Sequence, residues 1–292
     1  MCQLLGMNAA KPADLRFSFT GFAARGGLTD HHDDGFGIGF FEDRACRLFM
    51  DNQAAANSPV ADLIKRYPIK SCNVISHIRK ATQGDPLRLE NSHPFTRELW
   101  GRHWLFAHNG DLIDYHPVSG GYYQPVGNTD SERAFCVLLE ELKQISPREP
   151  CSLDTVFEAL CAMSERTSEF GVFNYLLSNG QALFAHCSTR LYYLQREWPF
   201  AKAKLVDTEL SIDFARTNDA EDHLCVVATQ PLTLNENWQQ LQAGQLLWME
   251  GGRIVRQAQL KVTRMLLKRS CQFLDEHQAR RVQIDAVVNG HL

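Results

Sequence analysis

The chain places a cysteine at its second position, directly in front of an apolar segment. Residues 3–7 read Gln-Leu-Leu-Gly-Met and end at Asn8, and a short apolar run closed by such residues predicts a buried strand. Cysteine is small enough that we expect Met1 to be removed, which leaves Cys2 as the mature N-terminus. That one residue would then carry a thiol nucleophile and an α-amino group with a pKa of about 8. A nucleophile and its base would arrive together at the start of a buried strand.

Two helical patterns lie between runs of predicted strands. Thr129-Asp130-Ser131-Glu132 forms a capping box for a helix through Ile145, and residues 152–165 predict a second helix. The predicted strands lie at residues 2–7, 34–41, 72–79, 104–108, 172–178, 181–187, 191–196 and 224–230. Helices enclosed by runs of strands favour an α+β layered domain over a repeated βαβ unit.

Composition and charge exclude several classes of protein. The net charge of −4 argues against a nucleic-acid or anionic membrane surface, and no apolar run approaches the roughly 18 residues that span a bilayer. The first residues lack the basic and apolar regions of a secretory signal. Nine scattered cysteines without a C-x-x-C pair argue against a disulfide framework and a zinc ribbon. We expect a cytoplasmic protein with no metal or cofactor, and we interpret Asp30-His31-His32-Asp33-Asp34 as a solvated loop.

Three further motifs carry the chemistry that a thiol-dependent amide hydrolase needs. His108-Asn109-Gly110 follows an apolar strand, where a side-chain amide and a backbone N–H can stabilise an oxyanion; a simple Asn-Gly turn is the alternative. Arg79 ends a predicted strand and can hold a carboxylate through two parallel hydrogen bonds. Asp130 can bind an ammonium group, although an aspartate in a first helical turn often serves only the helix dipole. A ligand with an α-carboxylate, an α-amine and a carboxamide at its other end is glutamine, so these residues predict glutamine as the substrate.

The motifs together resemble the class II (N-terminal nucleophile) glutamine amidotransferases, in particular the stand-alone bacterial YafJ-like group. The matching segments are Met1-Cys2, Arg25-Gly26, residues 34–37, 77–82, 91–95, 108–110 and 129–132, and later residues 228–232, Trp238 and Gly244. The resemblance implies a four-layer αββα sandwich, the N-terminal nucleophile hydrolase fold, in a glutamine amidotransferase type 2 domain over residues 2–256.

The resemblance also implies a role for each matching residue. Cys2 would attack the side-chain amide of L-glutamine to form a glutamyl thioester and release ammonia, and water would then release glutamate. The other implied roles are an oxyanion hole for Asn109 and Gly110, binding of the α-carboxylate for Arg79 with Thr82, binding of the α-amino group for Asp130, and lining or support of the site for Arg25 and His93. Lys80 and Gln83 depart from the family, in which an aromatic residue and a histidine are frequent at these positions. This departure affects the expected closure over bound glutamine.

Alternatives remain open for the substrate and for the last 36 residues. The chain would pass ammonia to a separate synthase subunit, or it would hydrolyse other γ-glutamyl amides or peptides; a non-catalytic scaffold subunit is the third interpretation. A homo-oligomer is compatible with the sequence. Residues 257–292 form a C-terminal extension, either an amphipathic helix or a partly disordered segment.

Overall fold

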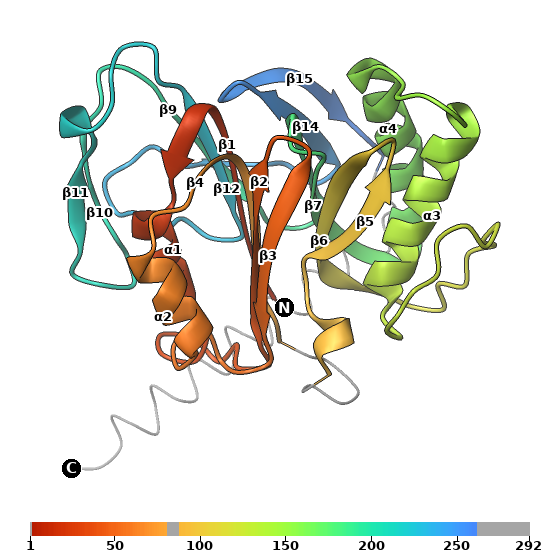
Figure 1. Ribbon diagram of the computed structural model, residues 1–292, viewed down its shortest axis with the longest axis horizontal. Coiled ribbons are helices and arrows are strands. Elements are labelled where there is room, and N and C mark those ends of the chain that lie inside the picture. The colour runs from red at the N-terminus through yellow and green to blue at the C-terminus, as the bar shows by residue number, and fades with distance from the viewer. Residues whose placement is uncertain (1, 81–87, 262–292) are drawn as a thin grey trace.

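Two antiparallel β-sheets pack face to face between two layers of helices (Figure 1). The computed structural model describes residues 2–80 and 88–261. Helices α1 (Arg16–Ala24) and α2 (Pro59–Arg66) cover the outer face of the first sheet, and α3 (Asp130–Ile145) and α4 (Leu153–Ser168) cover that of the second. This arrangement confirms the four-layer αββα sandwich.

The first sheet has seven strands in the order β13-β9-β12-β1-β4-β2-β3. Its strands are β1 (Gln3–Asp14), β2 (Phe36–Glu42), β3 (Ala45–Asp51), β4 (Lys70–Ile78), β9 (Tyr192–Arg196), β12 (Leu224–Ala228) and β13 (Gln239–Gln240). The first strand of the chain, β1, is therefore central, between β12 and β4. It continues beyond the apolar segment predicted from the sequence and reaches Asp14, with a register shift between Asn8 and Ala13.

The second sheet has six strands in the order β15-β14-β8-β7-β6-β5. Its strands are β5 (Phe95–Leu99), β6 (Arg102–Leu112), β7 (Gly171–Ser178), β8 (Ala182–Cys187), β14 (Gln245–Glu250) and β15 (Arg253–Gln259). A separate two-stranded sheet contains β10 (Lys202–Lys204) and β11 (Ser211–Asp213), and two 3-10 turns cover Leu89–Asn91 and Phe214–Arg216.

The capping box that the sequence indicated begins α3, and a serine caps α4 in the same way. The Thr129 side chain accepts a hydrogen bond from the Glu132 amide at the start of α3, and the Ser152 side chain accepts one from the Thr155 amide at the start of α4. Such caps satisfy amides that have no partner within the helix. None of the helices in the described ranges is long and apolar enough to cross a bilayer.

Alternation along the strands divides the interior into three layers. One apolar cluster fills the space between the sheets, and the other two lie beneath the helices on the outer faces. Leu4 of β1, Ile75 of β4 and Ala107 of β6 belong to the inter-sheet cluster. Since side chains two residues apart on a strand lie on one face, these residues indicate which neighbouring side chains also lie between the sheets.

The boundary that we expected at residue 256 falls inside β15, and Leu260 is buried beneath α3 and α4. The part of the C-terminal extension from residue 262 onward lies outside the described residues.

Candidate active site

Cys2 and Arg79 lie side by side at one end of the first sheet. The antiparallel register of β1 and β4 places them opposite each other, one residue beyond the last paired positions. Cys2 follows the alternation of Leu4 and therefore lies on the inter-sheet face. The Lys80 amide donates to Cys2 Sγ at 3.3 Å, and the thiol lies 3.4 Å from the Lys80 carbonyl oxygen. These contacts hold the thiol at the position where β4 ends.

The environment of Cys2 favours the protonated thiol. Burial raises the pKa of the Cys2 thiol above its ordinary value, and the charge of Asp34 acts in the same direction. The Lys80 amide and the Arg79 guanidinium oppose this shift without reversing it. A nucleophilic Cys2 therefore needs a base that takes its proton during attack.

The segment Asp34-Gly35 fixes the backbone of Arg79 from the other side. The Arg79 amide donates to the Gly35 carbonyl at 2.9 Å, and the Asp34 amide donates to the Arg79 carbonyl at 3.3 Å. Gly35 has a φ of 99°, and a Cβ there would lie 2.7 Å from the Asp51 carbonyl oxygen. This position therefore requires glycine. The result is an arginine that is 7% exposed and held in place at the edge of the inter-sheet space.

Two stacked histidines lie next to Arg79: His77, two residues earlier on β4, and His93. The rings of His77 and His93 have centroids 4.2 Å apart, and Phe95 packs on the other side of His93 at 4.4 Å. Burial lowers the pKa of His77 to about 3 and holds that of His93 well below its ordinary value. Both imidazoles are therefore neutral at neutral pH. His93 contacts the site through His77, which makes it a supporting residue.

Asn109 and Gly110 lie near the end of β6, on the opposite side of the inter-sheet space. Asn109 follows the alternation of the buried Ala107, is 1% exposed, and its carbonyl accepts a hydrogen bond from Asn174 Nδ2 at 3.0 Å. A Cβ on Gly110 would overlap the carbonyl oxygen of Val172 on β7. Glycine is therefore required for the two strands to approach at this point.

The start of α3 is tied to the same end of β6. His108 Nε2 donates to the Val172 carbonyl at 2.9 Å, so Nδ1 is the acceptor for the Ser131 hydroxyl at 2.7 Å. The Asp130 carboxylate accepts hydrogen bonds from the Leu112 amide at 2.7 Å and from the Ser131 amide at 2.8 Å. The carboxylate of Asp130 therefore has a fixed position relative to the strand that carries Asn109.

Arg25 is buried beside the loop that follows β12. The residue is 3% exposed. Its guanidinium donates hydrogen bonds to the Asp207 carboxylate at 2.8 Å and to the carbonyl oxygens of Gln230 and Pro231 at 3.1 and 2.6 Å. Thr229, the preceding residue, accepts a backbone amide of β1 at 2.8 Å. Arg25 therefore ties the end of α1 to the loop that follows β12, next to β1.

The structure brings most of the predicted residues to one end of the inter-sheet space. Cys2 with Arg79 comes from the first sheet, and Asn109 with Gly110 and Asp130 from the second sheet and its covering helix. Thr82, together with Gln83, lies outside the described residues. In the described stretches no three His, Cys, Asp or Glu side chains are arranged to hold a metal ion.

Two residues that hold the site together were not identified from the sequence. Asn174 is fully buried and makes four hydrogen bonds, to Asn109, Ser188 and Thr189. Ser131 was considered only as part of a capping box. The signal for Asn174 was present, because a lone amide within the apolar strand 172–178 requires buried partners.

Comparisons with known proteins give a consistent result. The family model for class II glutamine amidotransferases matches residues 1–272. YafJ of Escherichia coli is 49% identical over 256 residues, 87% of this chain and 100% of that protein. A Haemophilus influenzae protein is 50% identical over 252 residues, 86% of this chain and 85% of that protein. Both are named as candidate glutamine amidotransferases.

Solved structures extend the comparison to the fold. A crystal structure of a predicted glutamine amidotransferase from Pseudomonas aeruginosa is 41% identical with a TM-score of 0.70, covering 87% of this chain and 100% of that one. The glutamine phosphoribosylpyrophosphate amidotransferase of Bacillus subtilis is 15% identical with a TM-score of 0.54, covering 90% of this chain and 50% of that one. At this identity the second match shows a shared fold alone.

Proposed function

Because the chain belongs to the class II glutamine amidotransferases, we propose that Cys2 is the nucleophile that attacks the side-chain amide of glutamine. The observation that carries the proposal is the position of the Cys2 thiol, held at the Lys80 amide beside Arg79 and on the inter-sheet face that Asn109 shares. Removal of Met1 is part of the proposal, because the free α-amino group of Cys2 is then the base that the protonated thiol needs.

The reaction proceeds through a thioester. The Cys2 sulfur forms a bond to the amide carbon as the thiol proton passes to the α-amino group of the same residue. The C–N bond then breaks, the nitrogen takes that proton, and ammonia leaves. Water attacks the glutamyl thioester, which yields glutamate and restores the thiol. The side-chain amide of Asn109 and the N–H of Gly110 stabilise the oxyanion, and each such donor typically contributes about 3 kcal/mol.

The two charged residues select the amino-acid end of the substrate. Arg79 binds the α-carboxylate with help from Thr82, because a guanidinium can form two parallel hydrogen bonds to a carboxylate. Asp130 binds the α-ammonium group with the carboxylate lone pairs that its two backbone donors leave free. His93 and Arg25 support these residues through the contacts described above.

Labelling with a diazoketone analogue of glutamine tests the nucleophile and the substrate together. We expect intact mass to show loss of Met1 and one adduct, mapped to Cys2. Cys2→Ser should carry no adduct, whereas Cys46→Ser, which changes another half-buried thiol, should be labelled like the wild type. An adduct that persists in Cys2→Ser would contradict the proposal.

A second assay separates glutamine from other γ-glutamyl compounds. We propose that glutamine hydrolysis is faster than hydrolysis of γ-glutamyl peptides, and the reverse order would favour a hydrolase of larger γ-glutamyl amides. The ammonia acceptor would be a separate synthase subunit, so a co-purified partner should raise product formation from glutamine over that from free ammonia. The cytoplasmic location and the division at residue 256 are proposals that rest on the sequence.

A further inference from the structure

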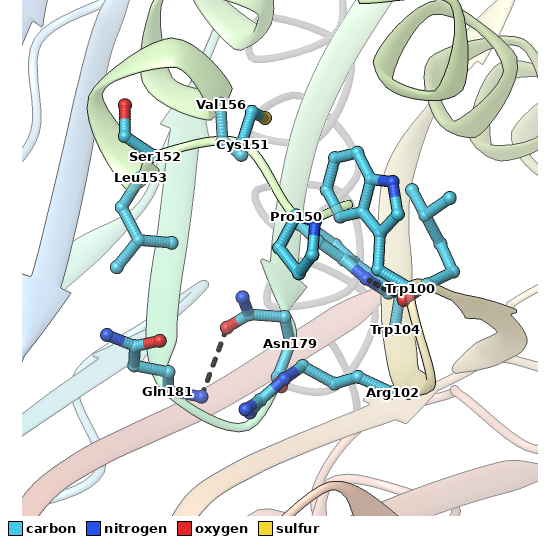
Figure 2. A pocket seen from close by; sticks show the side chains of 11 residues that line it. Trp100, Arg102, Trp104, Pro150, Cys151, Ser152, Leu153, Val156, Asn179 and Gln181 are labelled. Atoms are coloured by element: carbon cyan, nitrogen blue, oxygen red, sulfur yellow. Dashed lines mark hydrogen bonds between the residues drawn. The ribbon is translucent and has the colours of Figure 1, made fainter. Parts of the chain in front are cut away.

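A pocket lies at the opposite end of the six-stranded sheet from the candidate active site. It has a volume of about 330 Å³ and opens between the β5–β6 turn, the β7–β8 turn and the segment before α4 (Figure 2). Pockets of roughly 300–1,000 Å³ are typical of small-molecule sites, so this one suits a small ligand.

The pocket and the active site are separated by the length of β6. Arg102, which lines the pocket, is the first residue of β6, and Asn109 lies seven residues further along the same strand. At the rise of an extended strand this separation is about 23 Å. The pocket is therefore distinct from the site that holds Cys2.

The apolar wall of the pocket is fixed by hydrogen bonds. Trp100 Nε1 donates to the Ser146 carbonyl at 2.9 Å, and Trp104 Nε1 donates to the Leu99 carbonyl at 3.3 Å. The two indoles meet edge to face, with centroids 6.1 Å apart and an interplanar angle of 69°. Trp100 has a φ of 59°, which bulky residues rarely adopt. Trp104 is 1% exposed, so these contacts hold the half-buried indole of Trp100 in place, and a ligand would meet one preformed apolar face.

The polar side of the pocket carries a positive charge. Arg102 is the one charged side chain among the lining residues, and its guanidinium donates to the Asn179 carbonyl at 3.0 Å. Over the described residues Arg102 forms no ion pair. Of the carboxylates adjacent to lining residues in the described ranges, Asp154 pairs with Arg256, Glu98 accepts a hydrogen bond from the Gly101 amide and Glu250 accepts one from Gln181; none of these three pairs with Arg102. The α4 dipole, which begins at this pocket, adds to the positive potential.

We propose that this pocket binds a small organic anion with a flat apolar body. The carboxylate or phosphate of the ligand pairs with the free N–H groups of Arg102, and its body lies against the half-buried indole of Trp100, which packs edge to face on the buried Trp104. An arginine beside aromatic rings matches such a ligand, because guanidinium groups bind planar oxyanions while indoles bury apolar surface. The site is independent of the amidotransferase chemistry proposed above.

A probe series that varies only the head group tests the charge requirement. We would measure binding of indole-3-acetate, 3-methylindole and tryptamine to the full chain by calorimetry and ligand-observed NMR, and add phenyl phosphate to compare phosphate with carboxylate. We expect saturable binding of at least one anion, with the neutral and cationic indoles bound about tenfold more weakly or not at all. Equal binding of the three indoles, or no saturable binding of either anion at millimolar concentration, would overturn the proposal.

Variants at the arginine locate the binding. Arg102→Gln should weaken anion binding by about tenfold or more, and Arg102→Lys, which keeps the charge, should weaken it less. Arg44→Gln changes an exposed arginine on the β2–β3 turn that does not line the pocket, so it should bind like the wild type. Equal losses in Arg102→Gln and Arg44→Gln would assign the effect to overall charge and refute the site.

Cys151 offers a readout that does not depend on those variants. It lines the pocket, whereas Cys161 is a half-buried thiol on α4 outside it. The bound anion should slow alkylation of Cys151 by iodoacetamide and leave Cys161 unchanged, as measured by peptide mapping. Binding without protection of Cys151 would place the ligand elsewhere.

Discussion

At the scale of single residues, the candidate site contains positions at which only one residue type fits. A Cβ at position 110 would overlap the Val172 carbonyl oxygen, so Gly110→Ala must push β6 and β7 apart beside Asn109. We expect kcat for glutamine hydrolysis to fall by about 10²–10³, the usual effect of losing an oxyanion donor, together with a lower Tm. The control is Gly120→Ala, where the nearest atom to a new Cβ is an ordinary 3.4 Å away. Similar losses in both variants would contradict the assignment.

The charged residues of the site allow a second test at this scale. Arg79→Lys removes the two parallel hydrogen bonds to a carboxylate, and Asp130→Asn removes the charge that attracts an ammonium group. Each should lower kcat/KM for glutamine by a factor equivalent to about 2–4 kcal/mol of transition-state stabilisation, because each loses a charge contact, at the buried Arg79 or the half-buried Asp130. Arg47→Lys, on exposed β3, is the matched control. Unchanged kcat/KM in the two site variants would show that the ligand is not bound by its amino-acid end.

Single residues were predicted better than the contacts that hold them. Cys2, Arg79 and Asn109 were identified from motifs, and alternation along their strands explains why all three lie on the inter-sheet face. The hydrogen bonds of Asn174 and the stack of His77 on His93 could not be predicted, because they depend on how strands and loops pack in space and not on local sequence pattern. Arg25 shows the same limit, since its three acceptors lie about 180 to 206 residues away in sequence.

At the scale of elements, the start of α3 and the end of β6 form one unit. The Ser131 hydroxyl donates to His108, and Asp130 accepts the Leu112 amide. The capping box predicted where α3 begins, but it could not predict that two of its residues, Asp130 and Ser131, bind β6. The helix therefore does more than cover the sheet, because its contacts with β6 fix the position of Asp130 relative to the proposed oxyanion donors on that strand.

Removing the Ser131 hydroxyl tests this unit. Ser131→Ala leaves a buried histidine nitrogen without its donor, which should cost about 1–3 kcal/mol of stability. If the bond positions Asp130, KM for glutamine should rise more than kcat falls, and Ser131→Thr should restore both. Ser152→Ala, which removes the exposed cap of α4, should cost about 1 kcal/mol with unchanged kinetics. Loss of stability with unchanged KM in Ser131→Ala would reduce the bond to a purely structural role.

At the scale of the whole molecule, the four layers were predicted and the pocket beside Arg102 was not. Helices between runs of strands indicated an α+β arrangement, and the family resemblance supplied the αββα order. The pocket beside Arg102 needs three turns to meet that are separated by about 50 and 30 residues. The local sequence pattern cannot predict that these segments lie together, because their proximity follows from how the sheet and α4 pack.

Buried neutral histidines should make the stability of the whole molecule fall in mild acid. Burial lowers the pKa of His77 to about 3 and of His186 to about 4, whereas an unfolded chain binds these protons below about pH 6.5. The unfolded state therefore binds more protons between about pH 6.5 and pH 4, and the free energy of unfolding decreases as the pH falls through this range. His186→Phe should reduce that slope by up to about 1.4 kcal/mol per pH unit, measured by denaturant unfolding at each pH. His31→Gln, at an exposed position, should leave the slope unchanged, and a wild-type slope in His186→Phe would show that His186 does not stay neutral in the folded protein.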